Sequence, residues 1–454
     1  MLRVDPTSGK AKWTGSASFK SIASAVLSIL IGLIVGAIIV VIVGLVSPEI
    51  SNKSIGEGMK LVLFGVLSTG RNAAGQLSFG FNAVNVGNML FRAMPLLMTG
   101  LSVAIAYKTG LFNIGASGQY LMGTTGTITT ALVLGNTACP KFIVWILAFA
   151  AGVLLGALWG AIPGIFKAYL NINEVITCIM TNWIAANLVS WWFEAHDVFK
   201  NAAEGGKVAY TIPLKNVGVV TPKLGFGVLT PGSQANGGFW IACLIAVLMW
   251  VVMSKTTFGY ELKACGSNRH AAKYAGINDK RNIILSMVIA GALASAGASL
   301  YYLSGNTEFY WSTYMSLPPE GFNGIPVALL ASNHPIGVIF AGIFMSMLNI
   351  AGLQLKYLTP YNEYIADIII AAIVYLSAFS MLFKEILNRR EKKSGKHVGP
   401  NANAEVENRK EFNEKEVVDM IEAEEMAEND ETSAEYDAKM KAKEEAKMAK
   451  GGTV

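Results

Sequence analysis

Long apolar stretches separated by shorter polar connections run through the first 384 residues of the chain. A helix needs about 20 mainly apolar residues to cross the hydrocarbon layer of a bilayer. Ten stretches come close to that length, and each predicts a membrane-crossing helix: 22–46, 84–106, 111–134, 142–166, 175–195, 239–253, 283–303, 313–332, 336–354 and 362–383. The pattern therefore predicts an all-α, polytopic integral membrane protein with about ten transmembrane helices.

Basic residues gather in alternate connections between these stretches, which indicates how the chain is oriented. Lys and Arg accumulate in the cytoplasmic loops of membrane proteins. Here they precede the first stretch, follow the second, fourth and tenth, and are densest after the sixth: Lys10, Lys12, Lys20, Lys108, Lys167, Lys255, Lys263, Arg269, Lys273, Lys280, Arg281, Lys384, Arg389, Arg390, Lys392 and Lys393. With ten crossings these particular residues fall on one side, so we expect a multi-pass plasma-membrane protein with both termini in the cytoplasm.

Two polar segments should then lie outside the cell. The connection 196–238 carries three prolines. Trp191 and Trp192 precede it, where a helix would meet the membrane interface, and packing within the protein is the alternative role for both. The segment 47–82 contains the apolar stretch 61–67, which is too short to span. We expect that stretch to lie along the surface.

Composition and charge place the chain among membrane proteins and divide it into three parts. Apolar residues make up 53% of the sequence and charged residues 15%, against about 25% charged residues in soluble domains. The last 70 residues hold 13 of the 36 basic and 18 of the 31 acidic residues. We predict a cytoplasmic N-terminus (1–21), a transmembrane domain (22–384) and a charged cytoplasmic tail (385–454), either disordered or loosely helical on a partner. A secreted domain, a nucleic-acid binder and an ordinary cytosolic enzyme are excluded.

Few residues are placed for catalysis or metal binding. Cys139, Cys178, Cys243 and Cys265 lie far apart, without a C-x-x-C pair or a nearby pair of histidines. No cluster of His, Cys or carboxylates gathers at one depth of the predicted membrane domain. We therefore expect neither disulfides nor a structural metal, and no enzymatic activity in this chain.

Glycines recur every four residues along one predicted helix: Gly152, Gly156, Gly160 and Gly164. Residues four apart lie on the same helix face. A stripe of small residues lets a second backbone approach closely, which is how helices associate within lipid. The stripe therefore predicts a tight helix–helix contact, and Gly32 with Gly36 predicts a weaker one in the first span.

Two glycine-rich stretches at predicted membrane depth carry side-chain amides and are expected to break a helix: 110–126, which begins GLFNIGASGQ, and 318–326, PPEGFNGIP. Irregular backbone in a bilayer is tolerated where protein or a water-filled cavity satisfies its polar groups. Paired interruptions in the two halves of a chain point to a transport site, and kinks with a packing role are the alternative. Uncharged residues would then line a pathway for a neutral polar solute: Asn113, Ser117, Gln119, Thr124, Asn182 and Asn323.

Two sources of energy for uphill transport are open. Asp367, with Glu363 one turn earlier, is the ionisable group expected at membrane depth, where such groups often relay protons. The chain contains no G-x-x-x-x-G-K-[ST] phosphate-binding loop, so any ATP would be hydrolysed by a separate subunit. Its docking site would be the connection 259–278, where Asn268 is a good N-cap and Gly276 is placed to end a short helix. A surface linker helix is the alternative.

Five stretches of the chain resemble bacterial ABC importer permeases of the ribose and simple-sugar family, related to branched-chain amino acid permeases, and in particular their nucleoside-type branch. They are 95–104 (PLLMTGLSVA), 110–119 (GLFNIGASGQ), 173–177 (NEVIT), 264–277 (ACGSNRHAAKYAGI) and 321–330 (GFNGIPVALL). The resemblance covers roughly residues 20–384 in order.

This resemblance implies a transporter assembled from several chains. Two permease subunits, often two different chains, would form the pathway. A separate ATPase subunit would bind ATP and Mg, and an external substrate-binding lipoprotein would deliver the solute. The motif 264–277 matches the family's coupling helix, which seats in a groove of the ATPase, and so implies these contact residues: Gly266, Asn268, Ala271, Ala272, Tyr274, Gly276 and Ile277.

The chain departs from the family pattern at two places. The family commonly has Glu where this chain has Ser117, and the tail beyond Arg390 has no counterpart in it. The resemblance implies a permease subunit that imports nucleosides, purine or broad, with no cofactor of its own. A permease for a simple sugar such as ribose or galactose, or a proton-coupled carrier that uses Asp367, are the alternatives.

Overall fold

The computed structural model describes residues 17–201, 209–312, 316–362 and 364–378. The chain divides into two units, residues 1–384 and 385–454, and every described residue belongs to the first. The tail and the first 16 residues lie outside the described part, so the predictions made for them stay predictions.

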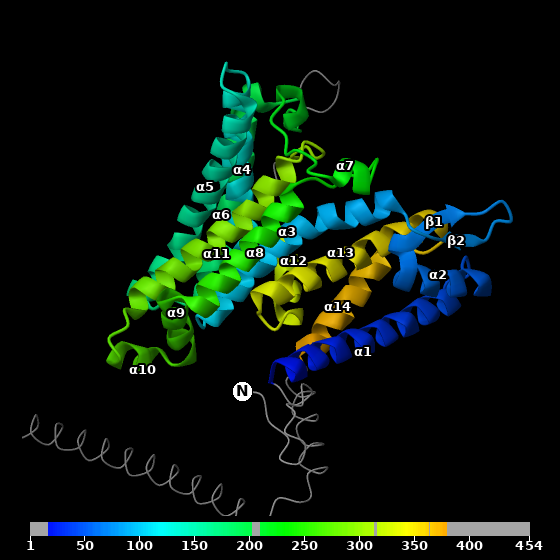
Figure 1. The fold of residues 1–454 in the computed structure, drawn as a ribbon, viewed down its shortest axis with the longest axis horizontal. Helices are drawn as coiled ribbons and strands as arrows, with labels where there is room; N and C mark the ends of the chain where they lie inside the picture. The colour runs from blue at the N-terminus through cyan, green and yellow to red at the C-terminus, as the bar shows by residue number, and fades with distance from the viewer. Residues whose placement is uncertain (1–16, 202–208, 313–315, 363, 379–454) are drawn as a thin grey trace, which may run out of the picture. The chain divides into compact units, whose positions relative to one another are not determined.

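Helices account for most of the described chain (Figure 1). In chain order they are α1 (Ala17–Val46), α2 (Asn52–Phe64), α3 (Ala83–Lys108), α4 (Ala116–Gly135), α5 (Lys141–Leu170), α6 (Glu174–Ala195), α7 (Phe226–Leu229), α8 (Gly238–Lys255), α9 (Thr257–Ser267), α10 (Arg269–Tyr274), α11 (Asp279–Tyr302), α12 (Pro319–Leu330), α13 (Pro335–Leu358) and α14 (Tyr364–Ala378), with single 3-10 turns at Gly65–Leu67, Asp197–Phe199 and Leu214–Val217. Two short strands, β1 (Ser68–Arg71) and β2 (Leu77–Phe79), pair antiparallel.

Each of the ten predicted spans contains a helix, but they differ in length. Six helices of the described chain are long and apolar enough to cross a membrane: α3, α5, α6, α8, α11 and α13. Two more have shorter apolar runs, Leu30–Val46 in α1 and Tyr364–Ile373 in α14. The prediction of an all-helical, multi-pass membrane protein is confirmed.

The predicted span 313–332 differs from the others. Its helix α12 has 12 residues, which is about 18 Å of helix against about 30 Å of hydrocarbon. After α12 the chain turns at His334 directly into α13. The prediction of a helix over the whole of 313–332 is therefore wrong, because α12 is short, whereas the number of crossings stays a prediction. The related stretch 318–326 is helical rather than a break, whereas residues 109–115 are non-helical as expected.

The predicted glycine stripe lies where α5 packs against α4 and α11. A Cβ added to Gly160 would lie 3.0 Å from the Cα of Gly291, and one added to Gly164 would lie 3.1 Å from the Cα of Ile284. Such distances leave no room for a side chain, so the prediction of a close backbone contact is confirmed. Gly32 and Gly36 contact α14 just as closely, since an added Cβ would lie 2.8 Å from Ile373 Cα and 2.8 Å from Ile369 Cγ2, so the prediction of a weaker contact there is wrong.

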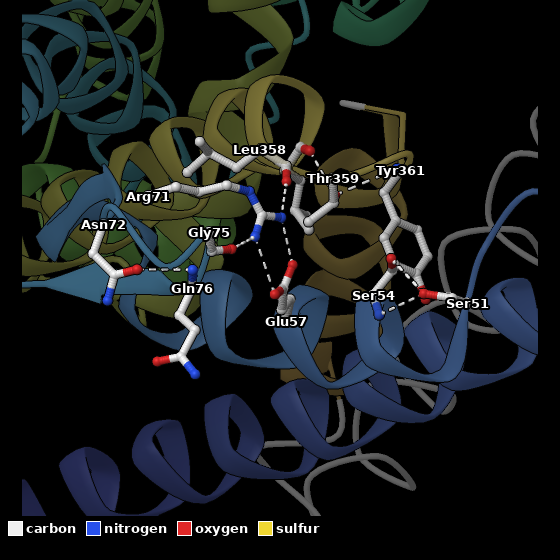
Figure 2. Close-up of polar contacts among 11 residues, drawn as sticks. Ser51, Ser54, Glu57, Arg71, Asn72, Gly75, Gln76, Leu358, Thr359 and Tyr361 are labelled. Atoms are coloured by element: carbon white, nitrogen blue, oxygen red, sulfur yellow. Dashed lines mark hydrogen bonds and ion pairs between the residues drawn. The ribbon is translucent and has the colours of Figure 1, made fainter.

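The α2–β1–β2 segment is held together by the guanidinium of Arg71 (Figure 2). It donates to the Glu57 carboxylate at 2.5 and 3.1 Å, to the carbonyl of Gly75 at 2.6 Å and to that of Leu358 at 2.7 Å. The hydrogen bond from Arg71 holds the pKa of the Glu57 carboxyl below its ordinary value. One side chain thereby joins α2, the hairpin and the end of α13.

Helix α2 is not a purely surface-lying segment, contrary to the expectation for residues 61–67. Leu61 and Val62 are buried in the main hydrophobic core, while Leu63 and Phe64 are exposed. Of the two indoles near residue 190, Trp192 donates from Nε1 to Thr129 Oγ1 at 3.0 Å, which is a packing role. The neighbouring indole of Trp191 is exposed.

Candidate functional site

A cavity of about 290 Å³ lies among α3, α12, α13, α14 and the last turn of α11. We call it the inner chamber. Its polar lining combines opposite charges, amides and phenol rings: Arg92, Tyr301, Glu320, Asn323, Asn349, Tyr364 and Asp367. Pro95, Leu96 and Leu353 are among its apolar neighbours. It is therefore a mixed polar and apolar site of the kind that takes a small molecule.

Several polar side chains of the inner chamber make no direct polar contact with other described residues. In the part of the chain that the structure describes, the side chains of Arg92, Asn323 and Asn349 form no hydrogen bond or ion pair. Arg92 lies close enough to Glu320 for the two charges to interact. A guanidinium offers five donors and each amide offers both donors and acceptors. These groups are therefore available to a polar solute.

A second cavity of about 310 Å³, the outer chamber, adjoins the first toward the Ala83 end of α3. It shares Arg92 and Leu353 with the inner chamber and is otherwise lined mainly by amides and one phenol: Asn85, Asn88, Gln234, Gln354 and Tyr357. Its α3 residues, Asn85, Asn88 and Arg92, are spaced three and four apart, so they follow one helix face. The two chambers together form a polar track along α3.

Most of the sequence-predicted pathway residues lie elsewhere. Asn113 and Gln119 are buried and bond to each other reciprocally: Asn113 Nδ2 donates to Gln119 Oε1 at 2.8 Å and Gln119 Nε2 donates to Asn113 Oδ1 at 3.1 Å. Asn113 also accepts from the backbone N–H of Gly115 at 3.1 Å. Asn113 thereby satisfies one backbone N–H of the non-helical residues 109–115, as backbone inside a membrane requires.

The other buried members of the predicted set also hold the fold together. Asn182 accepts from Gly118 N at 2.9 Å and donates to Ile114 O at 3.0 Å, so α6 clamps the start of α4. Ser117 Oγ donates to Pro318 O at 3.0 Å. Thr124 Oγ1 donates to Tyr120 O, also at 3.0 Å, within α4.

Among the six predicted pathway residues, Asn323 is the one that lines the inner chamber. Ser117 stands where the resemblance expects Glu. It is fully buried, and a Cβ added to Gly321 would lie 2.5 Å from its backbone nitrogen. The start of α12 therefore packs directly on the start of α4. A longer side chain at position 117 would have to displace that contact.

Sequence reasoning missed Arg92, Glu320 and Asn349. A signal for the first two was present, because both are charges inside predicted spans, where ionisable groups usually serve function. The inner chamber is therefore lined partly by charged side chains, whereas the sequence predicted an uncharged lining. Asp367 does line it, whereas Glu363 lies outside the described residues.

The predicted docking motif forms two helices, α9 and α10. Asn268 Oδ1 accepts from Ala271 N at 3.0 Å and so caps α10, as its sequence position predicted. Gly276, at φ +80°, ends the turn that follows, and Ile277 N donates to Ala272 O at 3.0 Å. Such a positive φ is the usual glycine C-terminal signal.

The motif presents an exposed surface on a fixed base. Tyr274 is 95% exposed, and Ala271 is exposed as well, whereas Ala272 is buried beneath them. At the base, a Cβ added to Gly110 would lie 3.3 Å from the Cα of Gly266. Helix α9 is therefore in backbone contact with the α3–α4 connection, next to the buried amide network.

A family model described as the permease component of a branched-chain amino acid transport system matches residues 85–378. The chain belongs to this permease family. The match includes all the residues of both chambers and the whole of α9 and α10, so the permease is a membrane-embedded transport component.

Relatives of this permease include transport proteins of several bacteria and an archaeon. It is 34% identical over 308 residues to the guanosine ABC transporter permease protein NupP of Bacillus subtilis, covering 68% of this chain and 85% of the relative. It is 35% identical over 328 residues to the nucleoside ABC transporter permease protein NupB of Lactococcus lactis, covering 68% and 88%. The glucose ABC transporter permease protein TsgB13 of Haloferax volcanii is 29% identical over 305 residues, covering 65% and 76%.

Proposed function

We propose that this permease imports nucleosides as the membrane subunit of an ABC transporter. Its inner chamber carries the proposal, because opposite charges, amides and phenol rings converge there. A nucleoside offers hydrogen-bond donors and acceptors on its base edge and on its ribose hydroxyls, and a flat face that stacks on aromatic rings. Arg92, Asn323 and Asn349 would bind the polar edges, with Tyr301 and Tyr364 beside the ring.

The names of the relatives support the same substrate class. Two relatives at 34% and 35% identity are named for guanosine or nucleoside transport, and the glucose permease is at 29%. A simple sugar is therefore the second candidate solute. A sugar has hydroxyls for the same amides but no aromatic ring face, so the two candidates are separable by competition.

ATP hydrolysis would take place on a separate ATPase subunit that binds ATP and Mg. The exposed face of α10 would seat on that subunit, with Tyr274 as the most exposed contact. A second permease chain would complete the pathway, and an external substrate-binding lipoprotein would deliver solute. Both termini would then be cytoplasmic. Movement of α10 would change the affinity of the inner chamber, and that difference in affinity between states does the coupling.

The test of the solute is competition uptake in cells that lack the gene and are complemented with wild type or variants. Wild type should restore uptake of labelled guanosine, blocked by excess unlabelled nucleosides and indifferent to ribose, galactose or glucose. Arg92→Gln should reduce that uptake at least tenfold at equal membrane abundance. Arg71→Gln is the matched control, since Arg71 is committed to Glu57 outside both chambers. If the wild-type gene restores uptake of a sugar and leaves nucleoside uptake unchanged, the proposed substrate is a sugar and not a nucleoside.

The same cells test the energy source. Asp367 lines the inner chamber, which is the observation that favours a proton-coupled carrier. ATP depletion should abolish uptake while a proton-conducting uncoupler, added with ATP maintained, should not. The opposite pattern, together with loss of uptake in Asp367→Asn, would favour the carrier.

The docking proposal is tested by recovery of the ATPase subunit. Tyr274→Ala should lower the amount of ATPase that purifies with the permease and lower its stimulated ATP hydrolysis. Tyr260→Ala is the control, because Tyr260 is an exposed tyrosine on α9 outside the predicted contact set. Equal recovery with both variants would remove α10 from the interface.

A further inference from the structure

A third cavity of about 400 Å³ lies where α5 ends and α11 begins, beside α10. Its lining is dominated by basic side chains: Asn171, Arg269, His270, Lys273, Asp279 and Lys280. Neither the inner nor the outer chamber is lined by any of these residues. A preference for basic residues at one membrane face explains their presence in this region, but it does not require them to converge on one cavity.

The single acid of this cavity is already paired. Arg269 Nε donates to Asp279 Oδ2 at 2.6 Å, which neutralises one positive charge and fixes α10 against the start of α11. In the described part of the chain, Lys273 forms no ion pair, and the ammonium of Lys280 lies 5.1 Å from the centre of the Tyr169 ring. The charge of Lys273 also acts on Asp279, but neither ammonium group forms an ion pair among the described residues.

Apolar side chains flank Asn171, the residue of this cavity that follows α5. Tyr169 and Leu170, in the last turn of this membrane-crossing helix, are 64% and 61% exposed, and Ile172 just beyond it is also exposed. Exposed apolar side chains on a membrane-crossing helix are suited to contact with lipid. The end of α5 is where such a helix would leave the hydrocarbon and enter the headgroup region.

We propose that this cavity binds the phosphate headgroup of an anionic phospholipid, whose acyl chains lie along Leu170 and Ile172. Unpaired ammonium groups beside a lipid-facing apolar edge match that ligand in both charge and polarity. Lys273 belongs to α10 and Lys280 to α11. A headgroup bound by both would join the exposed docking helix to the transmembrane bundle, independently of which solute is carried.

The test uses the purified full-length chain in a neutral detergent with fluorescent phosphatidylglycerol, and fluorescent phosphatidylcholine as the uncharged comparison. Wild type should bind phosphatidylglycerol at least tenfold more tightly than phosphatidylcholine. Lys273→Gln with Lys280→Gln should weaken phosphatidylglycerol binding roughly 25-fold, about fivefold for each basic residue.

The matched control removes the same number of charges nearby. Lys255 and Lys263 are exposed on α8 and α9, outside the cavity, and Lys255→Gln with Lys263→Gln should weaken binding less than twofold. Equal losses in the two double variants would overturn the proposal, because the attraction would then be a general effect of charge. Lys273→Arg with Lys280→Arg should retain binding, which separates loss of charge from misfolding.

Two other occupants are distinguished by competition. Inorganic phosphate at millimolar concentration should not displace the lipid; displacement by phosphate alone would make this a free-anion site and overturn the lipid assignment. The co-purified ATPase subunit should leave phosphatidylglycerol binding in place. Loss of binding on adding that subunit would assign the cavity to the protein interface instead.

Discussion

Replacing Gly160 by alanine tests the closest helix contact of the permease. The added Cβ would lie 3.0 Å from Gly291 Cα and still nearer to the carbonyl oxygen of Met287. Both obstacles are backbone atoms, so α5 and α11 would have to separate by about 0.5–1 Å to restore ordinary van der Waals distances. The glycine is therefore required by the proximity of the partner helix rather than by its own backbone conformation.

The size of the effect follows from two opposing contributions. Overpacking a tight interior costs about 1–3 kcal/mol, and a rigid backbone obstacle places this site in the upper part of that range. Alanine gains up to about 1 kcal/mol over glycine in a helix. We expect Gly160→Ala to lower the free energy of unfolding by about 1–2 kcal/mol.

Gly56→Ala is the matched control, because Gly56 is exposed in α2 and an added Cβ there meets no atom within 4 Å. It should raise stability by up to about 1 kcal/mol. The measurement is the fraction of monodisperse full-length protein that survives heating in detergent, at one heating rate for all variants. If Gly160→Ala and Gly56→Ala shift the thermal midpoint in the same direction by the same amount, the close approach of α5 and α11 is refuted.

Three further predictions use the same heating assay. Gln119→Leu should lower the free energy of unfolding by about 1–3 kcal/mol, because the buried amide of Asn113 would lose its hydrogen-bond partner. As the control, Asn323→Leu at the wall of the inner chamber should change it by less than about 0.5 kcal/mol. Tyr361→Phe removes the hydrogen bond of 2.8 Å from its hydroxyl to the backbone of α1 and should cost about 1 kcal/mol without changing uptake. The lowered pKa of Glu57 means that its pairing with Arg71 stabilises the protein above the ordinary carboxyl pKa and ceases to do so as the pH falls through the lowered value. The difference between wild type and Glu57→Gln, at most about 1 kcal/mol, should therefore be constant near neutral pH and vanish in strong acid; a pH-independent difference would contradict it.

Local rules predicted the parts of the fold that depend on nearby residues. Asn268 caps α10 and Gly276 terminates it because capping involves a side chain and a backbone only a few residues apart. The helices within the predicted spans followed from hydropathy, since a helix satisfies its own backbone in lipid. The glycine stripe predicted a close contact, but not that α4 and α11 are the helices that make it.

The candidate site was only partly predictable, for a physical reason. Asn113 and Asn323 have the same side chain at similar predicted depth, yet one is saturated with internal hydrogen bonds and the other faces the inner chamber. Sequence spacing cannot separate these roles, because the partners come from other helices. Arg92 likewise gains its significance from residues more than 200 positions away, such as Glu320.

By itself, the sequence determined that this chain is a helical membrane protein and roughly where its helices lie. It also determined how the motif 264–277 ends one helix and caps the next. Both follow because hydropathy and capping act over a few turns. Tertiary structure alone decided that α12 is a short arm folded against α13 and that two chambers follow α3. It also decided which polar groups are used up by the fold and which remain available to a ligand. That division depends on how helices distant in the sequence pack, since a hydrogen bond is satisfied by whichever group lies within about 3 Å of it.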